Sequence, residues 1–387
     1  MVAKGLSSRK ISVRGRAERV VATTSGGPAI VVLGTEQQAA WARKELPPVE
    51  SLPGGLWSVP VPIPDNPLRY TLSYLVPGDS GLVIVDPGWD DEETWTALQA
   101  GLVTAGASLT DVVGVVATHV HPDHHGLSAK VQELTGAWVA MHPAEAANLP
   151  QRVGAVSMTA RRQGMAWMLT TAGAGAEEMD ALVGTEAEAV DAPDYLMAEP
   201  DVLLEDGDFV PLPGRRLRAI WTPGHTPGHL CFQEPDAHVL LTGDHVLPRI
   251  SPNIGMHPDM ANPEDSPLAD FLESLEKVGR YDDHDALPAH EYRFRGLGVR
   301  TRQLIDHHEE RCQELLATVA ELGEPTLWEV AKGLTWSRSW EVIGRMRFAA
   351  LAETSAHVRH LVNRGELAWA GGRDGSGAVR VRLAIPA

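Results

Sequence analysis

Apolar and polar positions alternate along residues 55–141 in the manner of a layered α/β domain. Runs rich in β-branched and aromatic residues, separated by Pro, Gly, Asp and Asn, predict strands at 57–63, 70–76, 81–85, 112–117 and 137–141. Helical patterns at 92–102 and after Gly126 lie between these strands. Strands that alternate with helices predict an α/β body with helices packed on sheets.

The pattern changes twice further along the chain. Residues 143–200 are rich in Ala, Met and Glu and contain no strand pattern, so they predict a helical insertion. Strands at 209–221, 230–233, 238–241 and 286–287 and a helix at 268–278 complete the body. Helices at 304–319, 326–331 and 349–363 and a strand at 379–383 then predict a small further domain.

These changes divide the chain into three parts. Residues 1–50 form an N-terminal arm and an extension with a strand at 29–33 and a helix from Thr35. Residues 51–299 form the main domain, which includes the insertion at 143–200, and residues 300–387 form the C-terminal domain. Residues 1–20 are basic but lack the apolar core of a secretory signal. A mobile arm, an organelle transit peptide and an over-extended reading frame all fit them.

The composition is that of a globular protein without a membrane span. Of 387 residues, 43% are hydrophobic and 22% are charged, and no apolar run is long enough to cross a bilayer. The two cysteines, Cys231 and Cys312, fall in different predicted domains, so we expect free thiols and a cytoplasmic location.

The charge is unevenly distributed. The formal net charge is −18, yet residues 1–20 hold six basic side chains against one acidic one, and residues 301–387 hold eleven of each. The body between them is therefore strongly acidic and repels polyphosphate backbones, although bound dications reverse the field locally. A small-molecule substrate is expected, and nucleic acid is disfavoured.

A cluster of histidines and an aspartate follows the predicted strand at 112–117. His119 and His121 lie two residues apart at the end of this strand, so their side chains project to the same side. Asp123 and His124 come after Pro122 has turned the chain, and they face a second position. Imidazole nitrogen and carboxylate oxygen suit zinc and, less selectively, manganese or iron. The alternative is a histidine-rich polar loop without a metal.

Further donors follow other predicted strands. His225 lies between two Pro-Gly turns in the segment TPGHTPGH, Asp244 closes the segment TGD, and His290 closes the segment PAH. Asp86, in the segment VDPG, ends an earlier strand. Donors at the ends of several strands are well placed to meet at one metal site.

These motifs, in this order over residues 55–295, resemble the metallo-β-lactamase superfamily. The resemblance implies a four-layer αβ/βα sandwich and two divalent ions, Zn²⁺ first and Mn²⁺ or Fe²⁺ as alternatives. It implies ligands in two sets with one bridging residue: His119, His121 and His225 on one ion, Asp123, His124 and His290 on the other, and Asp244 on both. Asp86 then orients the ligands from behind.

The implied mechanism is hydrolysis by a hydroxide shared between two ions. Asp123 is the candidate catalytic residue, because it can orient that nucleophile or accept its proton. His245, like His125 and His229, adjoins a ligand, so a supporting or packing role is expected for it.

Substrate contacts are harder to predict than ligands. Met165, Trp167 and Met168 lie in the insertion, where they form either a lid over the metal site or an ordinary helical core. Tyr70 follows a loop that leads toward the same edge of the sheet, and it contacts substrate or belongs to a turn.

The C-terminal domain resembles the winged-helix domain of the β-lactamase-like-2 ribonucleases. The resemblance rests on the segment GEPTLWE at 323–329, the helix containing AHVRHL at 356–361 and the segment GEL at 365–367. Because this domain has no net positive charge, packing or formation of a homodimer is a stronger expectation than DNA binding.

Three functions from different classes remain open. The first is a dinuclear hydrolase that cleaves a carboxylic ester, thioester or lactone of a small molecule, with β-lactam hydrolysis as a side activity. The second is a phosphodiesterase or ribonuclease of the β-lactamase-like-2 type. The third is a metal-bearing regulator whose winged helix binds DNA.

Overall fold

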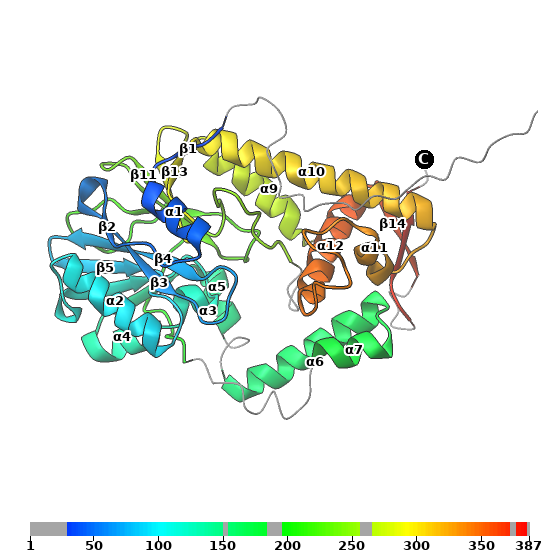
Figure 1. Ribbon diagram of the computed structural model, residues 1–387, viewed down its shortest axis with the longest axis horizontal. Helices are drawn as coiled ribbons and strands as arrows, with labels where there is room; N and C mark the ends of the chain where they lie inside the picture. The colour runs from blue at the N-terminus through cyan, green and yellow to red at the C-terminus, as the bar shows by residue number, and fades with distance from the viewer. Residues whose placement is uncertain (1–28, 150–153, 184–195, 256–264, 372–376, 385–387) are drawn as a thin grey trace, which may run out of the picture.

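The computed structural model describes residues 29–149, 154–183, 196–255, 265–371 and 377–384 (Figure 1). Two sheets lie at its centre. The seven-stranded sheet consists of β2 (Glu50–Ser51), β3 (Trp57–Pro62), β4 (Tyr70–Gly78), β5 (Gly81–Val85), β6 (Val112–Val116), β7 (Trp138–Met141) and β8 (Val202–Leu203), in that order. The six-stranded sheet has the order β1 (Val31–Val32), β13 (Phe294–Arg295), β12 (Asp285–Pro288), β11 (Val239–Gly243), β10 (Leu230–Glu234) and β9 (Arg218–Trp221).

The alternation of side chains along the strands builds the layers. In β5, Val83 and Val85 point into a core between the two sheets, where they meet Phe232 of the other sheet. Leu82 and Ile84, on the opposite face, pack with the outer helices. Since both faces of β5 are buried, its sequence is a continuous apolar run.

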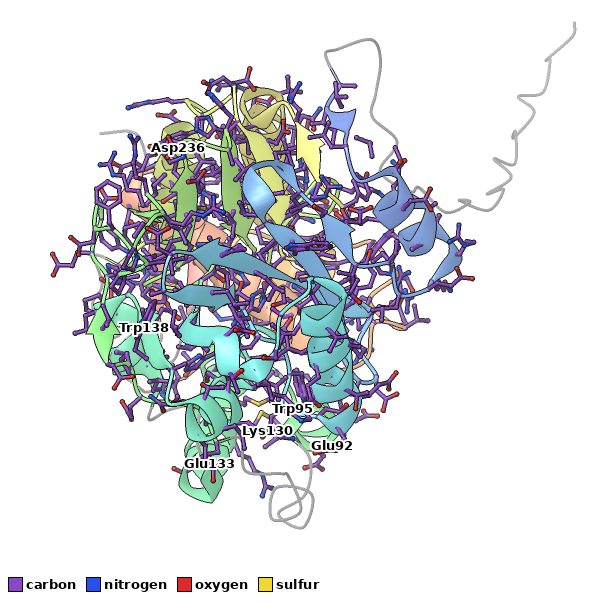
Figure 2. All side chains as sticks on the ribbon, turned by 90° about the vertical axis from the view of Figure 1, so that its left-hand side faces the viewer. Glu92, Trp95, Lys130, Glu133, Trp138 and Asp236 are labelled. Carbon is purple, nitrogen blue, oxygen red and sulfur yellow. The ribbon has the colours of Figure 1, made fainter. Side chains whose placement is uncertain are left out.

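Helices cover the outer face of each sheet. On the seven-stranded sheet these are α2 (Glu92–Thr104) and α4 (Ser128–Thr135). Lys130 of α4 reaches Glu92 of α2 at 2.9 Å and lies 4.8 Å from the ring centroid of Trp95, so it joins the two helices (Figure 2). On the six-stranded sheet the cover consists of α9 (Pro267–Val278) and α10 (Leu297–Leu322). The predicted αβ/βα sandwich is confirmed.

The remaining helices lie mostly beside this sandwich, and α1 (Thr35–Arg43) lies against it (Figure 1). The insertion contributes α5 (Pro143–Asn148), α6 (Gly154–Ala172) and α7 (Ala176–Val183). The C-terminal part consists of α11 (Leu327–Gly333), α12 (Met346–Asn363) and a hairpin of β14 (Leu367–Gly371) and β15 (Arg380–Leu383). Two helices and a hairpin agree with the predicted elements, whereas membership of the winged-helix family stays a prediction.

The C-terminal part is continuous with the sandwich. Helix α10 runs across the predicted boundary at residue 299 and packs against both α9 and α12. One apolar core contains Phe271 of α9, Leu315 of α10 and Leu361 of α12. Helix α6 also packs on α11 and α12. The sequence pattern therefore changes near residue 299, but the apolar core continues across it.

Some predicted details differ from the structure. The strand expected at 209–221 is present only as Arg218–Trp221, because Pro211, Pro213 and Gly214 interrupt extended pairing. The two-residue strands β2, β8 and β13 were not predicted, since two residues carry no periodicity. The predicted N-terminal arm lies outside the described residues. Both cysteines are free thiols, as expected, and both are buried. No helix among the described residues is both long and apolar enough for a transmembrane span.

Candidate metal centre

Seven candidate ligands come together at one edge of the sandwich. They are His119, His121, Asp123, His124, His225, Asp244 and His290. The first four follow β6, with two of them in the short helix α3 (Pro122–His125), and the last three follow β9, β11 and β12. Each lies just beyond the carboxyl end of a strand, so residues far apart in the chain share one site.

Three imidazoles form the first group. Nδ1 of His121 lies 2.8 Å from Nε2 of His119 and 3.0 Å from Nε2 of His225. His119 and His225 are buried and come from different sheets. Three nitrogen donors that converge in this way offer the ligand set of a zinc-type site.

Two carboxylates and two imidazoles form the second group. Oδ2 of Asp123 lies 3.4 Å from Nε2 of His290 and 3.6 Å from Nε2 of His124. Asp244 faces both groups: its Oδ1 lies 3.1 Å from Nε2 of His290, and its Oδ2 lies 3.6 Å from Nε2 of His225. One carboxylate with an oxygen toward each group is the arrangement expected of a bridging ligand.

Hydrogen bonds at the far side of four rings fix which nitrogen faces the centre. Nδ1 of each ring lies beside an oxygen: His119 beside Thr118 Oγ1 (3.0 Å), His124 beside Asp86 Oδ2 (2.9 Å), His225 beside the Asn253 carbonyl (2.8 Å) and His290 beside the Tyr70 carbonyl (2.9 Å). Carbonyls and carboxylates only accept, and the Thr118 hydroxyl already donates to Asp86. Nδ1 therefore carries a proton in each ring, so Nε2 is the nitrogen available to a bound cation.

The buried ligand atoms fit a bound cation. Among the described residues, Nε2 of His124, Nε2 of His290 and Oδ1 of Asp244 are buried without a hydrogen-bond partner. Buried polar atoms without partners are costly in a folded protein, so three of them converging on one point indicate a missing ligand. Neutral nitrogen and anionic oxygen donors suit a divalent transition metal.

The pKa shifts describe the same charge pattern. Burial by itself lowers the pKa of His290, but Asp244 and Asp123 raise it to about 10. Burial and the neighbouring imidazoles lower the pKa of His119 well below its usual value. His119 and His225, whose pKa values are both lowered by burial, are thus neutral donors, whereas the raised pKa of His290 reflects negative charge on Asp244 and Asp123 that a dication would neutralise in place of the proton.

Asp86 supports the centre from behind. Its Oδ1 accepts the backbone N–H of Thr118 at 2.8 Å, and its Oδ2 accepts the Thr118 hydroxyl at 2.8 Å and Nδ1 of His124. Its own backbone has a φ of 55°, a left-handed conformation that Asp and Asn tolerate better than most residues. The side chain thereby touches the loop of the first group and a ligand of the second.

His245 contributes to packing rather than to ligand orientation. Its ring lies 4.8 Å from that of Phe271 in α9 and 5.8 Å from that of His229. It is His229 that contacts a ligand residue, since its Nε2 accepts the backbone N–H of Asp244 at 3.2 Å. Of the two roles expected of His245, support of a ligand and packing, its ring contacts fit packing.

The prediction that Tyr70 contacts substrate is wrong. Its side chain is fully buried, and its hydroxyl donates to the carbonyl of Glu291 at 2.7 Å. The ring packs edge-on against Trp41 at 5.6 Å. Tyr70 serves the centre through its main chain, whose carbonyl holds His290.

The predicted lid residues lie on α6. Met168 packs against the apolar core that α6 shares with the C-terminal helices, Met165 is half-buried, and Trp167 is 66% exposed. Met168 therefore follows the core alternative, whereas the lid role of Met165 and Trp167 stays a prediction.

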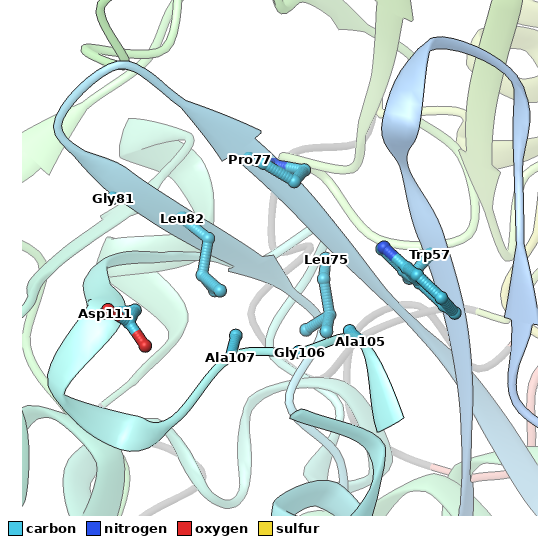
Figure 3. A pocket seen from close by; sticks show the side chains of 9 residues that line it. All are labelled: Trp57, Leu75, Pro77, Gly81, Leu82, Ala105, Gly106, Ala107 and Asp111. Atoms are coloured by element: carbon cyan, nitrogen blue, oxygen red, sulfur yellow. The ribbon is translucent and has the colours of Figure 1, made fainter. Parts of the chain in front are cut away.

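One cavity among the described residues has a volume of about 240 Å³, and Figure 3 shows the side chains that line it. It is at the turn between β4 and β5, the end of β5 opposite to Asp86, and Trp57, Leu75 and Leu82 make its wall apolar. The one carboxylate in its lining, Asp111, accepts the hydroxyl of Ser108 at 2.8 Å. We therefore place the chemistry at the metal centre.

An αβ/βα sandwich with this ligand set at its edge is typical of a class of metal-dependent hydrolases. The family model of the metallo-beta-lactamase superfamily matches residues 66–290. The chain belongs to this superfamily, as its motifs predict.

Solved structures extend the similarity beyond that segment. A metallo-beta-lactamase family protein from Thermus thermophilus is 30% identical, with a TM-score of 0.68 over 85% of this chain and 98% of that one. A beta-lactamase domain protein from Burkholderia ambifaria is 25% identical, with a TM-score of 0.69 over 92% of this chain and 97% of that one. These alignments reach well outside residues 66–290.

One relative whose name states an activity matches a smaller part of the chain. The atrochrysone carboxyl ACP thioesterase of Aspergillus fumigatus is 27% identical over 111 residues, which are 29% of this chain and 32% of that protein. The chain thus spans about a third of the length of this fungal relative.

Proposed function

We propose that the protein is a dinuclear metal hydrolase that cleaves a carboxylic ester, thioester or lactone of a small molecule. The observation that carries the proposal is the pair of adjacent ligand groups joined by Asp244, with ligand atoms that lack hydrogen-bond partners. The acidic composition disfavours polyphosphate substrates, and the thioesterase name of one relative favours an acyl substrate.

Each side chain has a defined task in this reaction. His119, His121 and His225 would hold one ion, Asp123, His124 and His290 the other, and Asp244 would hold both. When bound, two divalent ions lower the pKa of a water molecule and polarise the oxygen of the bond under attack. Zn²⁺ suits this donor set best, with Mn²⁺ or Fe²⁺ as alternatives.

Asp123 has a second task as the proton-handling group. Burial by itself would raise the pKa of this carboxyl, but His124 and His290 beside it lower it, so the group is ionised at neutral pH. Its main chain is held by Thr71, whose hydroxyl donates to the Asp123 carbonyl at 2.9 Å. A fixed, ionised carboxylate can accept a hydrogen bond from the attacking water and orient it.

The test is hydrolysis by metal-reconstituted protein of a panel of acyl thioesters, lactones and aryl esters. His121→Ala removes Nδ1 at the centre of the first group, so it should lower kcat/KM by at least about 100-fold, in line with loss of a ligand set rather than of one contact. Equal turnover by this variant would refute the proposal.

A phosphodiesterase or ribonuclease is the second candidate, because the two C-terminal helices and hairpin agree with elements of the β-lactamase-like-2 resemblance. Degradation of single-stranded RNA that titrates with added metal, together with inactivity on the acyl panel, would favour it. β-Lactam hydrolysis is a side activity to include in the panel.

A further inference from the structure

Glu145 contacts both loops that supply the first ligand group. This residue lies in α5, and its side chain is fully buried. Its Oε2 accepts the backbone N–H of Val120 at 2.9 Å, and its Oε1 accepts the backbone N–H of Gly228 at 2.7 Å. Val120 stands between His119 and His121, whereas Gly228 belongs to the TPGHTPGH segment that carries His225.

The two loops come from different sheets. The first follows β6 of the seven-stranded sheet, and the second joins β9 and β10 of the six-stranded sheet. The distance between His121 and His225 therefore depends on how the two halves of the sandwich are held together. The Glu145 carboxylate accepts one hydrogen bond from each loop beside the ligand histidines, so it fixes the distance between His121 and His225.

The fit between α5 and the second loop is close. A Cβ on Gly228 would lie 2.7 Å from the backbone nitrogen of Glu145 and 2.9 Å from Nδ1 of His142, so a larger residue would force the two segments apart. His142 also stacks on Trp221 with ring centroids 5.1 Å apart, and the indole of Trp221 donates to the carbonyl of Pro227 at 2.9 Å. Helix α5 is thus docked on the loop by packing as well as by hydrogen bonds.

We infer that Glu145 is a positioning residue that sets the geometry of the first metal-binding group. It touches neither substrate nor metal and acts through the main chain of the two loops. The inference rests on the proposed function only in taking the three histidines as metal ligands. A carboxylate suits the task because both of its oxygens accept, whereas an amide would direct an N–H group at one of the two backbone N–H groups.

The test compares Glu145→Gln with the matched control Glu234→Gln. Glu234 is also fully buried, and its Oε2 accepts the backbone N–H of Ala237 at 2.6 Å in the turn between β10 and β11, away from the ligand loops. Zinc affinity is measured by competition with a chromophoric chelator, and the electronic absorption spectrum of the Co²⁺-substituted protein reports ligand geometry. Chemical denaturation in the presence of a chelator gives the free energy of unfolding of the metal-free form.

We expect E145Q to weaken zinc binding by about 10- to 100-fold, the usual effect of losing a residue that orients ligands. Its Co²⁺ spectrum should change, and kcat should fall more than KM rises. E234Q disturbs one backbone hydrogen bond rather than two, so it should lose less stability than E145Q, and it should keep the zinc affinity and the spectrum of the wild type. If E145Q does not fold, Gly228→Ala separates the same two segments and should give the same change in affinity and spectrum.

Wild-type affinity and spectrum in the folded variant would overturn the inference, and so would equal effects of E145Q and E234Q. If the wild-type protein itself binds no zinc, the metal centre and the role of Glu145 fail together. If it binds zinc but hydrolyses no acyl substrate, only the proposed reaction fails, and the comparison of affinities still decides the role of Glu145.

Discussion

Replacing Asp86 by Asn tests whether the hydrogen bonds behind the ligands select the nitrogen that binds metal. Asn is nearly the same size as Asp and tolerates the left-handed φ of 55° at this position, so the backbone should be unchanged. The substitution removes the negative charge and turns one acceptor into a donor.

Both orientations of the new amide are unfavourable. If its oxygen accepts the backbone N–H of Thr118, its NH₂ group faces Nδ1 of His124, which must then accept and carry its proton on Nε2 instead. A protonated Nε2 cannot bind the second ion. In the flipped orientation the NH₂ group faces the Thr118 N–H, and leaving these donors unpaired costs about 1–3 kcal/mol.

The expected effect is a 10- to 100-fold weaker second site, equivalent to about 1.4–2.7 kcal/mol. The first group keeps its three imidazoles, and Asp86 reaches it only through Thr118 behind His119, so the variant should weaken the second site more than the first. The assay is metal content by mass spectrometry during titration with Zn²⁺ against a competing chelator. Asp201→Asn is the control, since Asp201 accepts the backbone N–H of Val139 at 2.9 Å and is not one of the seven ligands. Two ions bound with wild-type affinity by D86N would refute the argument about the His124 proton.

Two further predictions concern stability, both measured by chemical denaturation of the metal-free protein. Arg300→Met removes hydrogen bonds from a buried guanidinium to the carbonyls of Leu247 (2.6 Å) and Ile250 (2.8 Å), so the free energy of unfolding should fall by about 3 kcal/mol. The control is Arg302→Met at an exposed position, which should change this free energy by less than about 0.5 kcal/mol. Equal effects of the two substitutions would contradict the role given to Arg300. Burial lowers the pKa of His357 to about 3 from its usual 6.5. The charge of Arg311 and the histidines at 307 and 360 also lower this pKa, whereas the hydrogen bond to the Glu353 carbonyl raises it. Between pH 3 and pH 6.5 the unfolded state therefore binds more protons than the folded state, so the free energy of unfolding should fall as the pH drops below about 6.5. His357→Gln should show a smaller fall. Curves of unfolding free energy against pH that run parallel for the two proteins would contradict the lowered pKa of His357.

The sequence predicts ligands well because each ligand lies in a short motif at the end of an apolar strand. His119 and His121 need only the local geometry of one strand end, and the Pro-Gly turns around His225 mark a rigid loop. The ligands follow strands of two different sheets, so the motifs could be assigned to one centre only through the resemblance to the metallo-β-lactamase superfamily.

The residues that hold the ligands in place could not be predicted in the same way. Asn253 and Tyr70 contribute carbonyl oxygens, which every residue type has, so their sequence identity carries no signal. Tyr70 looked like a substrate contact because it follows a polar loop, whereas its burial depends on Trp41 and Glu291, which are distant in the chain. Glu145 looks like an ordinary helical residue until α5 is placed against both ligand loops.

The C-terminal region belongs to the support of the metal centre for the same physical reason. The loop after Asp244 supplies the Asn253 carbonyl that holds His225, and this loop is fastened by Arg300 of α10 and by Glu291, whose Oε2 accepts the backbone N–H of Arg249 at 3.0 Å. Since α10 continues into the core formed with α11 and α12, removing the C-terminal region would expose one face of the helix that fastens the loop. Weaker metal binding after such a truncation would therefore follow from lost support of the loop, and it would not by itself indicate that the C-terminal region binds a partner.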